Sequence, residues 1–301
     1  MTAIQEVAQE IGISSSYLGN IVKNRDKFYK AFYKTKATGD KRQIEAPSKT
    51  LKGIQRWILR NKLENTVLSE RTHGFIAGRS IKTNARYHVG KKYILAMDIK
   101  DFFPSIGIDK VYEVFYQKSR KEDVSLIYAR LCTYADRLPQ GAPTSPALSN
   151  IVFLPVDNRI TDQCDRMNLT YSRYADDLTF ASNDLDLLKE LYSKVKTIIN
   201  EEGYALNPRK TRYYSGKQKM VVTGLLLNSG QITTGRDRKR RIRAALYNYI
   251  ARNDDAVEIE KVLGIVAFIR GIEPDYYSRL KNYIYSLKKR CPESKRWQEP
   301  P

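Results

Sequence analysis

The sequence predicts an α+β protein, because strand-like runs and longer helical stretches occur in mixed order along its 301 residues. Apolar or alternating runs of strand length lie at Tyr93 to Met97, Leu169 to Arg173 and Leu178 to Ala181. Elsewhere apolar residues recur at helical spacing. We expect one sheet with one face covered by helices.

The N-terminal residues predict two short helices between Ile4 and Val22. Gly12 breaks the first helical pattern, and Ser14 is placed to cap the second helix. The pair resembles a helix-turn-helix, a motif that can bind duplex DNA. Packing against the rest of the protein, or binding of RNA or a protein partner, explains the pattern equally well. A basic, turn-rich segment from Lys34 to Pro47 follows, and then an amphipathic helix from Leu51 to Leu63.

The central part of the chain alternates between predicted strands and helices. Three helices are expected, at about Asp109 to Lys118, Asp123 to Ala135 and Ser145 to Met167. A loop precedes the third helix, and neither regular structure can span it because of its prolines and glycine, which are Pro139, Gly141, Pro143 and Pro146.

The C-terminal part is basic and helical. A cationic run from Arg236 to Arg243 leads into a helix, and two more helices are expected at about Asp255 to Arg270 and Pro274 to Lys289. We expect five cations of the run to contact nucleic acid, and a solvated helix face is the alternative. These five are Arg236, Arg238, Lys239, Arg240 and Arg241.

Composition limits the class of partner. A formal net charge of +20 suits binding to a phosphate backbone, and some of the 21 tyrosines can stack on unpaired bases. Three widely separated cysteines and two histidines give neither a disulfide framework nor a zinc site. There is no signal sequence and no apolar span near ~20 residues, so we expect a cytoplasmic protein that does not use a membrane.

Three aspartates are the strongest candidates for catalysis. Asp176 and Asp177 follow Tyr174-Ala175 in a predicted turn between two strands, and Asp98 ends the strand from Tyr93. If that strand lies beside the hairpin, the three carboxylates converge on one point. Such hard oxygen ligands suit Mg²⁺ and two-metal phosphoryl transfer. A solvated turn is the simpler alternative for an isolated Asp-Asp pair.

Five ordered stretches resemble the motifs of reverse transcriptases. They are Asp98-Ile99-Lys100-Asp101-Phe102-Phe103, Leu138 to Pro146, Tyr174 to Asp177, Gly203 to Thr211, and Val222-Thr223-Gly224-Leu225, which resembles the primer grip. Two finer features resemble retron reverse transcriptases: the Asn-Ala-x-x-His signature at Asn84 to His88, and the Val-Thr-Gly signature at Val222 to Gly224. We expect His88 itself to be structural.

The resemblance implies a right-hand polymerase fold of fingers, palm and thumb, with an antiparallel palm sheet and a helical thumb. It covers the chain from about Lys41 into the C-terminal helices. The expected regions are 1–72 for the N-terminal helices and fingers, 73–231 for the palm with remaining fingers elements and primer grip, and 232–301 for the thumb.

The resemblance also implies a role for individual residues. Asp98, Asp176 and Asp177 would be catalytic and, with the carbonyl of Ile99, would hold two Mg²⁺ ions, with Mn²⁺ as a substitute. Contacts to the incoming nucleotide would come from Lys41, Arg42, Asp101, Phe103, Gln140, Gly141 and Lys210. A solvated charged turn is the alternative for the first two of these.

Two of these residues carry specific expectations. Phe103 would clash with a ribose 2′-hydroxyl, so the product should be DNA, and a simple core role is its alternative. Lys210 would give a proton to departing pyrophosphate or contact a phosphate. Val222, Thr223 and Gly224 would bind nucleic acid as part of the primer grip.

The function implied is that of a retron RNA-directed DNA polymerase. It would use deoxynucleoside triphosphates to copy part of its own structured noncoding RNA, priming from a guanosine 2′-hydroxyl, and would stay bound to the branched RNA–DNA hybrid (msDNA). An accessory effector protein and a role in anti-phage defence are further expectations. We expect another protein to supply ribonuclease H activity.

Two alternatives remain. A group II intron or diversity-generating reverse transcriptase would lack the two retron signatures, and a non-catalytic RNA-binding scaffold would not need the three aspartates.

Overall fold

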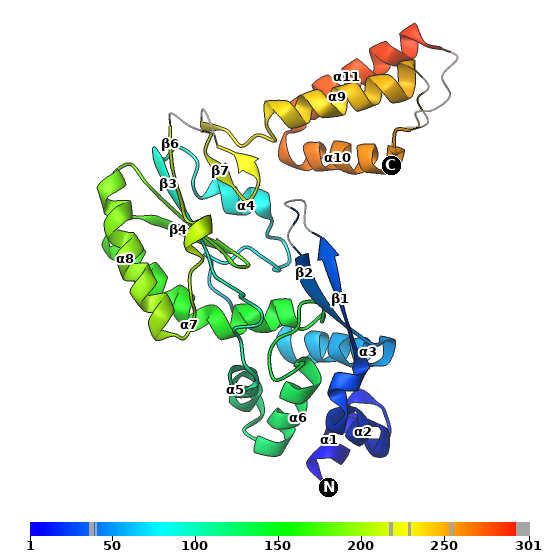
Figure 1. Ribbon diagram of the computed structural model, residues 1–301, viewed down its shortest axis with the longest axis vertical. Helices are drawn as coiled ribbons and strands as arrows, with labels where there is room; N and C mark the ends of the chain where they lie inside the picture. Colours follow the sequence, from blue (N-terminus) through cyan, green and yellow to red (C-terminus); the bar gives the residue numbers. More distant parts are fainter. Residues whose placement is uncertain are drawn as a thin grey trace.

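The computed structural model of the protein is elongated, with the first helices and the last three helices at opposite ends of a central sheet (Figure 1). The structure describes residues 1–35, 39, 41–216, 219–227, 230–252, 254 and 256–292. Three features of the sequence-based prediction therefore lie outside the described residues: the turn residue Asp40, the helix start at Asp255, and the end of the third region at 293–301.

The central sheet has four antiparallel strands in the order β4-β5-β3-β6. These are β3 (Tyr93–Asp98), β4 (Thr170–Tyr174), β5 (Asp177–Ser182) and β6 (Arg212–Ser215). Side chains alternate across the sheet, so Leu95 enters the main core while Ile94 enters a smaller one. Strand β5 begins at Asp177, one residue before the expected start, so the turn contains only Ala175 and Asp176.

Helices cover one face of this sheet. Helix α7 (Ser145–Arg166) packs on β4, and α8 (Leu185–Glu201) packs on β3, β5 and α7. In α8 a single buried stripe faces the sheet, formed by Leu188, Leu191, Val195 and Ile199. Helices α5 (Ile108–Ser119) and α6 (Glu122–Cys132) pair below α7. Helix α6 ends three residues before the predicted Ala135, because Thr133 takes an extended backbone.

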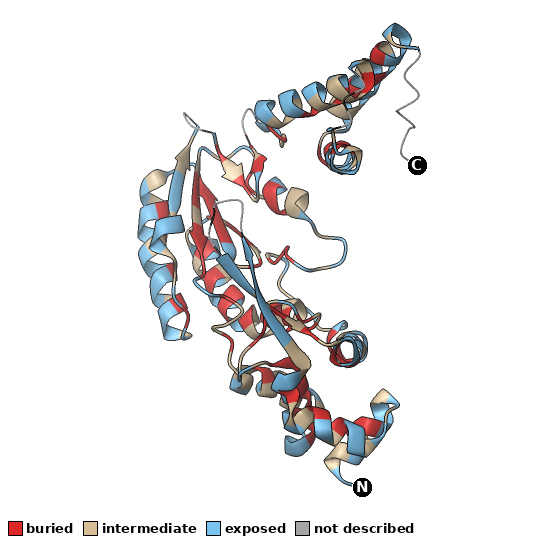
Figure 2. Ribbon diagram, turned by 45° about the vertical axis from the view of Figure 1, so that its right-hand side comes forward, coloured by how far each residue is buried: buried red, intermediate tan, exposed pale blue. Residues whose placement is uncertain are grey.

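The N-terminal region packs on α6. It begins with α1 (Ala3–Ile11), which ends at Gly12 with a φ of 80°, and α2 (Ser15–Lys23), which Ser14 caps as predicted. The apolar sides of both helices belong to the main core, which confirms packing against the rest of the protein, while binding of DNA, RNA or a partner by this pair stays a prediction. After η1 (Arg25–Phe28), strands β1 (Tyr29–Thr35) and β2 (Lys41–Pro47) form a largely exposed hairpin (Figure 2). Helix α3 (Lys49–Ile58) continues into a π-helical turn, η2 (Leu59–Leu63).

The remaining elements form two further cores. Helix α4 (Ile81–Arg86) packs on the short hairpin of β7 (Val221–Val222) and β8 (Leu225–Leu226). The C-terminal bundle of α9 (Arg236–Ala251), α10 (Ile259–Ile272) and α11 (Pro274–Arg290) has its own core, which includes Leu246 and Val266. The three predicted C-terminal helices are therefore present. In the described part of the chain, no helix combines the length and apolar character needed to cross a bilayer.

Candidate active site

Three carboxylates meet at one end of the central sheet. Asp98, the last residue of β3, is the direct cross-strand partner of Asp177, the first residue of β5. Asp176 occupies the turn just before β5, and its carbonyl accepts a hydrogen bond from the Ile99 N–H at 2.9 Å. The antiparallel register thus brings together residues that are far apart in the chain. This agrees with the convergence of the three aspartates predicted from the sequence. Their chemical roles stay predictions.

The carboxylates repel one another. Shielding from solvent, followed by the charges of Asp176 and Asp98, raises the pKa of the Asp177 carboxyl to about 6. Asp177 as a whole residue is exposed at the rim of the site, so water screens part of this repulsion. Burial is also the largest cause that raises the pKa of Asp98, and the Asp176 charge adds to it. The site has more negative charge than its own surroundings neutralise.

Lys210 provides the cation nearest to this cluster. It ends the short helix η3 (Pro208–Lys210), and its Nζ lies 2.6 Å from Asp98 Oδ2. This contact lowers the pKa of Asp98 against the effect of burial, and the Asp98 partner raises the pKa of Lys210 despite its desolvation. Asn207 supports the same residue, because its backbone N–H donates to the Asp98 backbone carbonyl at 2.8 Å and its side chain helps to lower the pKa of the Asp98 carboxyl. Asn207 was not among the candidate site residues predicted from the sequence.

The carboxylates suit divalent ions in their chemistry, since hard oxygen donors with surplus negative charge attract Mg²⁺. Their present side-chain positions do not form a complete ligand set. Among the residues that the structure describes, no group of three or more His, Cys, Asp or Glu side chains is arranged to hold one metal ion. Asp98 is paired with Lys210 instead. Ile99 is buried beside the turn, and metal binding by its carbonyl stays a prediction.

The loop after β3 carries two predicted nucleotide contacts. Asp101 is exposed and takes a φ of 48°, which turns the chain sharply. The two neighbouring aromatic residues differ: Phe102 is buried against Phe153, whereas Phe103 is half-buried with its ring 6.1 Å from the exposed Phe75. Phe103 also packs against the main core, so the core role stays an alternative and the sugar gate stays a prediction.

The Pro-Gln-Gly loop is attached to the β1–β2 hairpin. The Glu45 N–H donates to the Gln140 carbonyl at 3.0 Å, and a Cβ on Gly141 would lie 2.6 Å from the Glu45 carbonyl oxygen. Only glycine fits this close approach. Lys41 and Arg42 are exposed at the end of the hairpin nearest its connecting turn, and the hairpin stands apart from the sheet in Figure 1. A contact of these two cations with the nucleotide stays a prediction.

The two retron signatures meet in space. Thr223 and Gly224 form the two-residue turn of the β7–β8 hairpin, with φ values of 46° and 77°, after the buried Val222. Asn84 Nδ2 approaches Thr223 Oγ1 at 3.5 Å, and Asn84 Oδ1 accepts a hydrogen bond from Ser172 Oγ at 2.7 Å.

His88 completes this chain of contacts. Its Nε2 lies 2.7 Å from Ser172 Oγ, and burial lowers the pKa of the imidazole to about 3. His88 is thus a neutral, fully buried residue, in line with the structural role expected for it. The network joins the predicted primer grip to β4, the strand that leads into Asp176. Ser172 was missed because nothing in the sequence distinguishes it from an ordinary strand residue.

The cations of α9 lie on different sides of the helix. Arg236, Lys239 and Arg240 line a groove of about 620 Å³ together with Arg243 and aromatic residues that include Tyr247 and Tyr283. Lys239 also pairs with Glu273. By contrast, Arg238 turns toward α10, with its guanidinium 5.0 Å from the centre of the Phe268 ring, and Arg241 does not line the groove. Only part of the predicted cationic set therefore shares one surface.

Comparisons with known proteins agree with this geometry. Residues 32–227 match the family model described as reverse transcriptase (RNA-dependent DNA polymerase). The Retron Ec86 reverse transcriptase of Escherichia coli is 32% identical over 292 residues, covering 96% of this chain and 91% of that protein. The Retron Mx65 reverse transcriptase of Myxococcus xanthus is 32% identical over 298 residues, covering 92% of this chain and 70% of that protein.

A solved structure extends the similarity to the fold. The telomerase from Candida albicans, determined in complex with a TWJ fragment of telomeric RNA, aligns with a TM-score of 0.50 and 13% identity. The alignment covers 87% of this chain and 59% of that chain. Together with the antiparallel sheet and the C-terminal bundle, these matches confirm the right-hand polymerase fold predicted from the sequence.

Proposed function

Because this chain belongs to the retron reverse transcriptases, which are RNA-directed DNA polymerases, we propose that it copies its own structured noncoding RNA into branched msDNA. The observation that carries the proposal is the meeting of Asp98, Asp176 and Asp177 at one end of the sheet. Deoxynucleoside triphosphates are the second substrate. The hybrid of template RNA and product DNA stays bound to the protein.

We assign the three aspartates and the Ile99 carbonyl as the groups that hold two Mg²⁺ ions. When bound, these ions make the primer hydroxyl a better nucleophile and offset the charge on the departing pyrophosphate. The pairing of β3 with β5 holds the carboxylates in position, and Lys210 provides a cation that can exchange its partner. Lys210 must release Asp98 when the site is loaded, which leaves its ammonium free to contact a phosphate or to protonate pyrophosphate.

The remaining residues position the substrates. Phe103 faces the sugar of the nucleotide and favours deoxyribose, while Gln140 and Gly141 present a fixed backbone beside it. Lys41 and Arg42 neutralise the triphosphate when the fingers hairpin closes. The turn at Thr223 and Gly224 holds the primer, and the groove cations Arg236, Lys239 and Arg240 hold the RNA or the hybrid.

This assignment divides the chain into fingers with N-terminal helices at 1–72, palm at 73–231 and thumb at 232–301. The separate core of α9, α10 and α11 supports the last boundary. An accessory effector protein and a role in defence against phage complete the proposal. Both rest on the family resemblance.

The decisive experiment combines copurification with primer extension. The protein is purified from cells that express it with its neighbouring noncoding RNA, and the bound nucleic acid is sequenced. We expect RNA joined to DNA through a 2′-linked guanosine. In vitro, extension of a primer on an RNA template should require a divalent cation and should use deoxynucleotides.

Two substitutions give the controls. Asp176→Asn should reduce extension by roughly 10³-fold, because charge stabilisation in the transition state is lost. Asp186→Asn removes an exposed aspartate of α8 that pairs with Lys189, and it should leave extension unchanged. Equal activity of the two variants would show that the acidic cluster is not the active site. DNA without a branched RNA linkage would refute the retron part of the proposal alone.

A further inference from the structure

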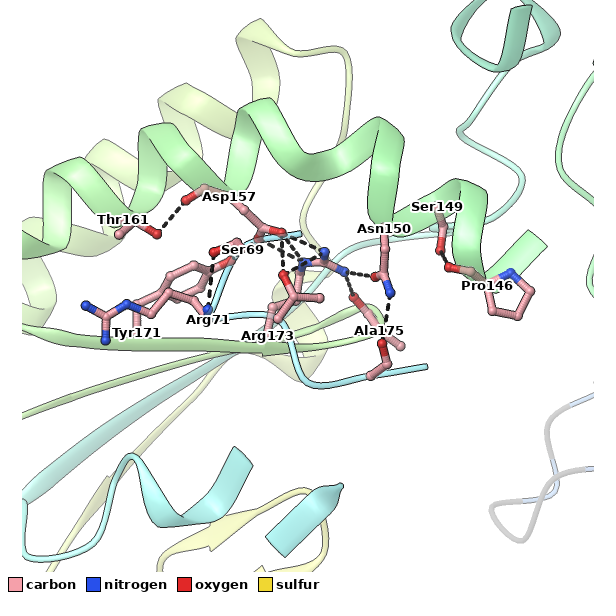
Figure 3. Close-up of polar contacts among 12 residues, drawn as sticks. Ser69, Arg71, Pro146, Ser149, Asn150, Asp157, Thr161, Tyr171, Arg173 and Ala175 are labelled. Carbon is pink, nitrogen blue, oxygen red and sulfur yellow. Dashed lines mark hydrogen bonds and ion pairs between the residues drawn. The ribbon is translucent and has the colours of Figure 1, made fainter. Parts of the chain in front are cut away.

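A buried arginine lies directly before the acidic turn. Arg173 is the last but one residue of β4, its side chain is fully inaccessible, and it pairs with the equally inaccessible Asp157 of α7 (Figure 3). Its Nε lies 2.9 Å from Asp157 Oδ1, and its Nη2 lies 2.6 Å from Asp157 Oδ2. The pair therefore links a palm strand to the helix behind it.

Every N–H of this guanidinium has an acceptor. Besides the contacts with Asp157, Nη2 donates to Thr72 Oγ1 at 3.3 Å. The other nitrogen, Nη1, donates to Asn150 Oδ1 at 3.1 Å and to the Ala175 carbonyl at 3.0 Å. Five donors in a planar fork are thus fully used. One of them ends on the backbone of the turn that carries Asp176.

The turn needs such support because its backbone is strained. Ala175 adopts a φ of 57°, in the left-handed region that favours glycine. A non-glycine residue stays there only when its surroundings hold it in place. The segment before α4 closes the other side, since a Cβ on Gly74 would lie 2.5 Å from the Ala175 nitrogen. Asn150 joins both sides by donating to the Gly74 carbonyl at 2.9 Å.

We propose that Arg173 is a positioning residue for polymerisation, which fixes the Ala175 backbone and thereby aims Asp176 and Asp177. Asp157 and Asn150 hold the guanidinium in the orientation that reaches the turn. The inference rests on the proposed catalytic roles of the aspartates. Arg173 lies behind the turn, within the core, and acts only through that turn.

Fold stability alone does not account for this cluster. Two buried charges lose their hydration, and well-packed apolar residues in their place often give equal or greater stability. An apolar pair would not donate to Ala175 or Asn150, however. Lysine would keep the positive charge but lacks the planar fork, so it could not serve Asp157, Asn150 and Ala175 together.

The test measures kcat and the KM for deoxynucleotides separately in Arg173→Lys. We expect kcat to fall about tenfold or more, because a small displacement of catalytic groups has a large kinetic effect. The KM and the affinity for template RNA should stay within about twofold of wild type, since neither the thumb groove nor the fingers is touched. Arg25→Lys is the matched control, because Arg25 is also buried but pairs with Asp136, away from the turn.

A second-site variant separates positioning from general packing. Glycine adopts positive φ without strain, so the kcat loss caused by Arg173→Lys should be smaller in an Ala175→Gly background. If Arg173→Lys does not fold, the double variant Arg173→Met with Asp157→Leu is measured instead, and it should keep the thermal midpoint but lose kcat. Wild-type kcat in the folded variant, a loss equal to that of Arg25→Lys, or equal losses in both backgrounds would overturn the inference.

The proposed function has its own, separate outcome. If Asp176→Asn keeps wild-type activity, the assignment of the active site is wrong. If Asp176→Asn is inactive while the folded Arg173 variant is fully active, only the positioning role is wrong.

Discussion

Two kinds of carboxylate are connected through the end of β4 and its turn, and their surroundings are opposite: Asp157 of α7 pairs with Arg173 behind the turn, whereas Asp98, Asp176 and Asp177 lie at the turn itself. Asp157 is matched by Arg173, Thr72 and Tyr171, and no solvent reaches it. Asp98, Asp176 and Asp177 share one lysine, and the exposed Asp177 opens the cluster to solvent at the end of the sheet.

The difference teaches which charges are structural and which are available for chemistry. A carboxylate whose acceptor sites are filled by the protein can only stabilise or orient its neighbours. Burial, followed by the charge of neighbouring carboxylates, raises the pKa values of Asp98 and Asp177, so a bound cation would stabilise this cluster. Under the proposed function, Asp157 helps to hold the backbone of the turn, and the three aspartates at the end of the sheet are left to bind substrate and metal.

The strongest test of this comparison is to replace one aspartate of each kind by asparagine. Asp157→Asn leaves the Arg173 charge buried without its partner, so we expect the free energy of unfolding to fall by about 3–5 kcal/mol. Asp177→Asn removes a repulsive charge, so stability in the absence of metal should stay equal or rise. Urea denaturation of both variants provides the measurement. Equal destabilisation would show that the two groups do not differ as described.

Phe102 and Phe103 allow the same comparison between a buried structural residue and a residue available for substrate contact. Phe102 packs into the region of Arg173 and Phe153, so Phe102→Ala should lower the free energy of unfolding by about 3–5 kcal/mol. Phe103→Ala should cost much less stability, because this side chain is only half-buried.

The effect on nucleotide selectivity should be the opposite of the effect on stability: larger for Phe103→Ala than for Phe102→Ala. We expect Phe103→Ala to lower the preference for deoxynucleotides over ribonucleotides by roughly tenfold, as for a lost steric contact. The ratio of kcat/KM for the two nucleotide classes measures this. An unchanged ratio would remove Phe103 from the sugar gate.

The sequence predicted the local parts of this arrangement well. Strand composition before Asp98 and around the Asp-Asp pair located β3, β4 and β5, and Gly12 and Ser14 correctly marked the end of α1 and the start of α2. These features depend on neighbours in the chain. The antiparallel order of the sheet came from the family resemblance.

Long-range features could not be predicted in the same way. Arg173 occupies a place in β4 where alternation alone does not reveal a buried charge, and its partner Asp157 comes from a helix whose orientation only the tertiary structure defines. Helix α8 was missed although its apolar residues have helical spacing. The direction of Arg238, toward Phe268 and not into the groove, likewise depends on how α9 packs on α10.

Metal binding should also distinguish the acidic cluster from Asp157, through an effect on stability that is smaller than those of the substitutions above. The raised pKa of Asp177 means that its protonated form stabilises the metal-free protein below pH about 4, and that this contribution is lost as pH rises through about 6. Above pH 7, saturating Mg²⁺ should restore stability, by ~2.7 kcal/mol at a hundredfold excess over Kd. Thermal unfolding of wild type and Asp176→Asn at pH 5 and pH 8 provides the measurement. The gain should be largest in wild type at pH 8, and an equal gain in the variant would contradict binding at this site.

The smallest predicted effect concerns Lys210, the cation that the acidic cluster does possess. Its charge lowers the pKa of both Asp98 and Asp177, so Lys210→Met should raise both pKa values. Wild-type activity should fall as pH drops through about 6, because protonated carboxyl groups bind cations poorly. In Lys210→Met this decline should begin at higher pH, by less than about one unit, because solvent screens a half-exposed lysine.

Single-turnover rates from pH 5 to 8 measure the shift. Lys189→Met, which removes an exposed lysine from α8, is the control and should leave the profile in place. A profile that moves to lower pH in Lys210→Met would mean that another group controls it, since loss of a neighbouring positive charge can only make these carboxyl groups harder to ionise. A lower plateau at high pH without any shift would instead assign Lys210 to phosphate contact or proton donation alone, and would separate its chemistry from its electrostatic effect on the aspartates.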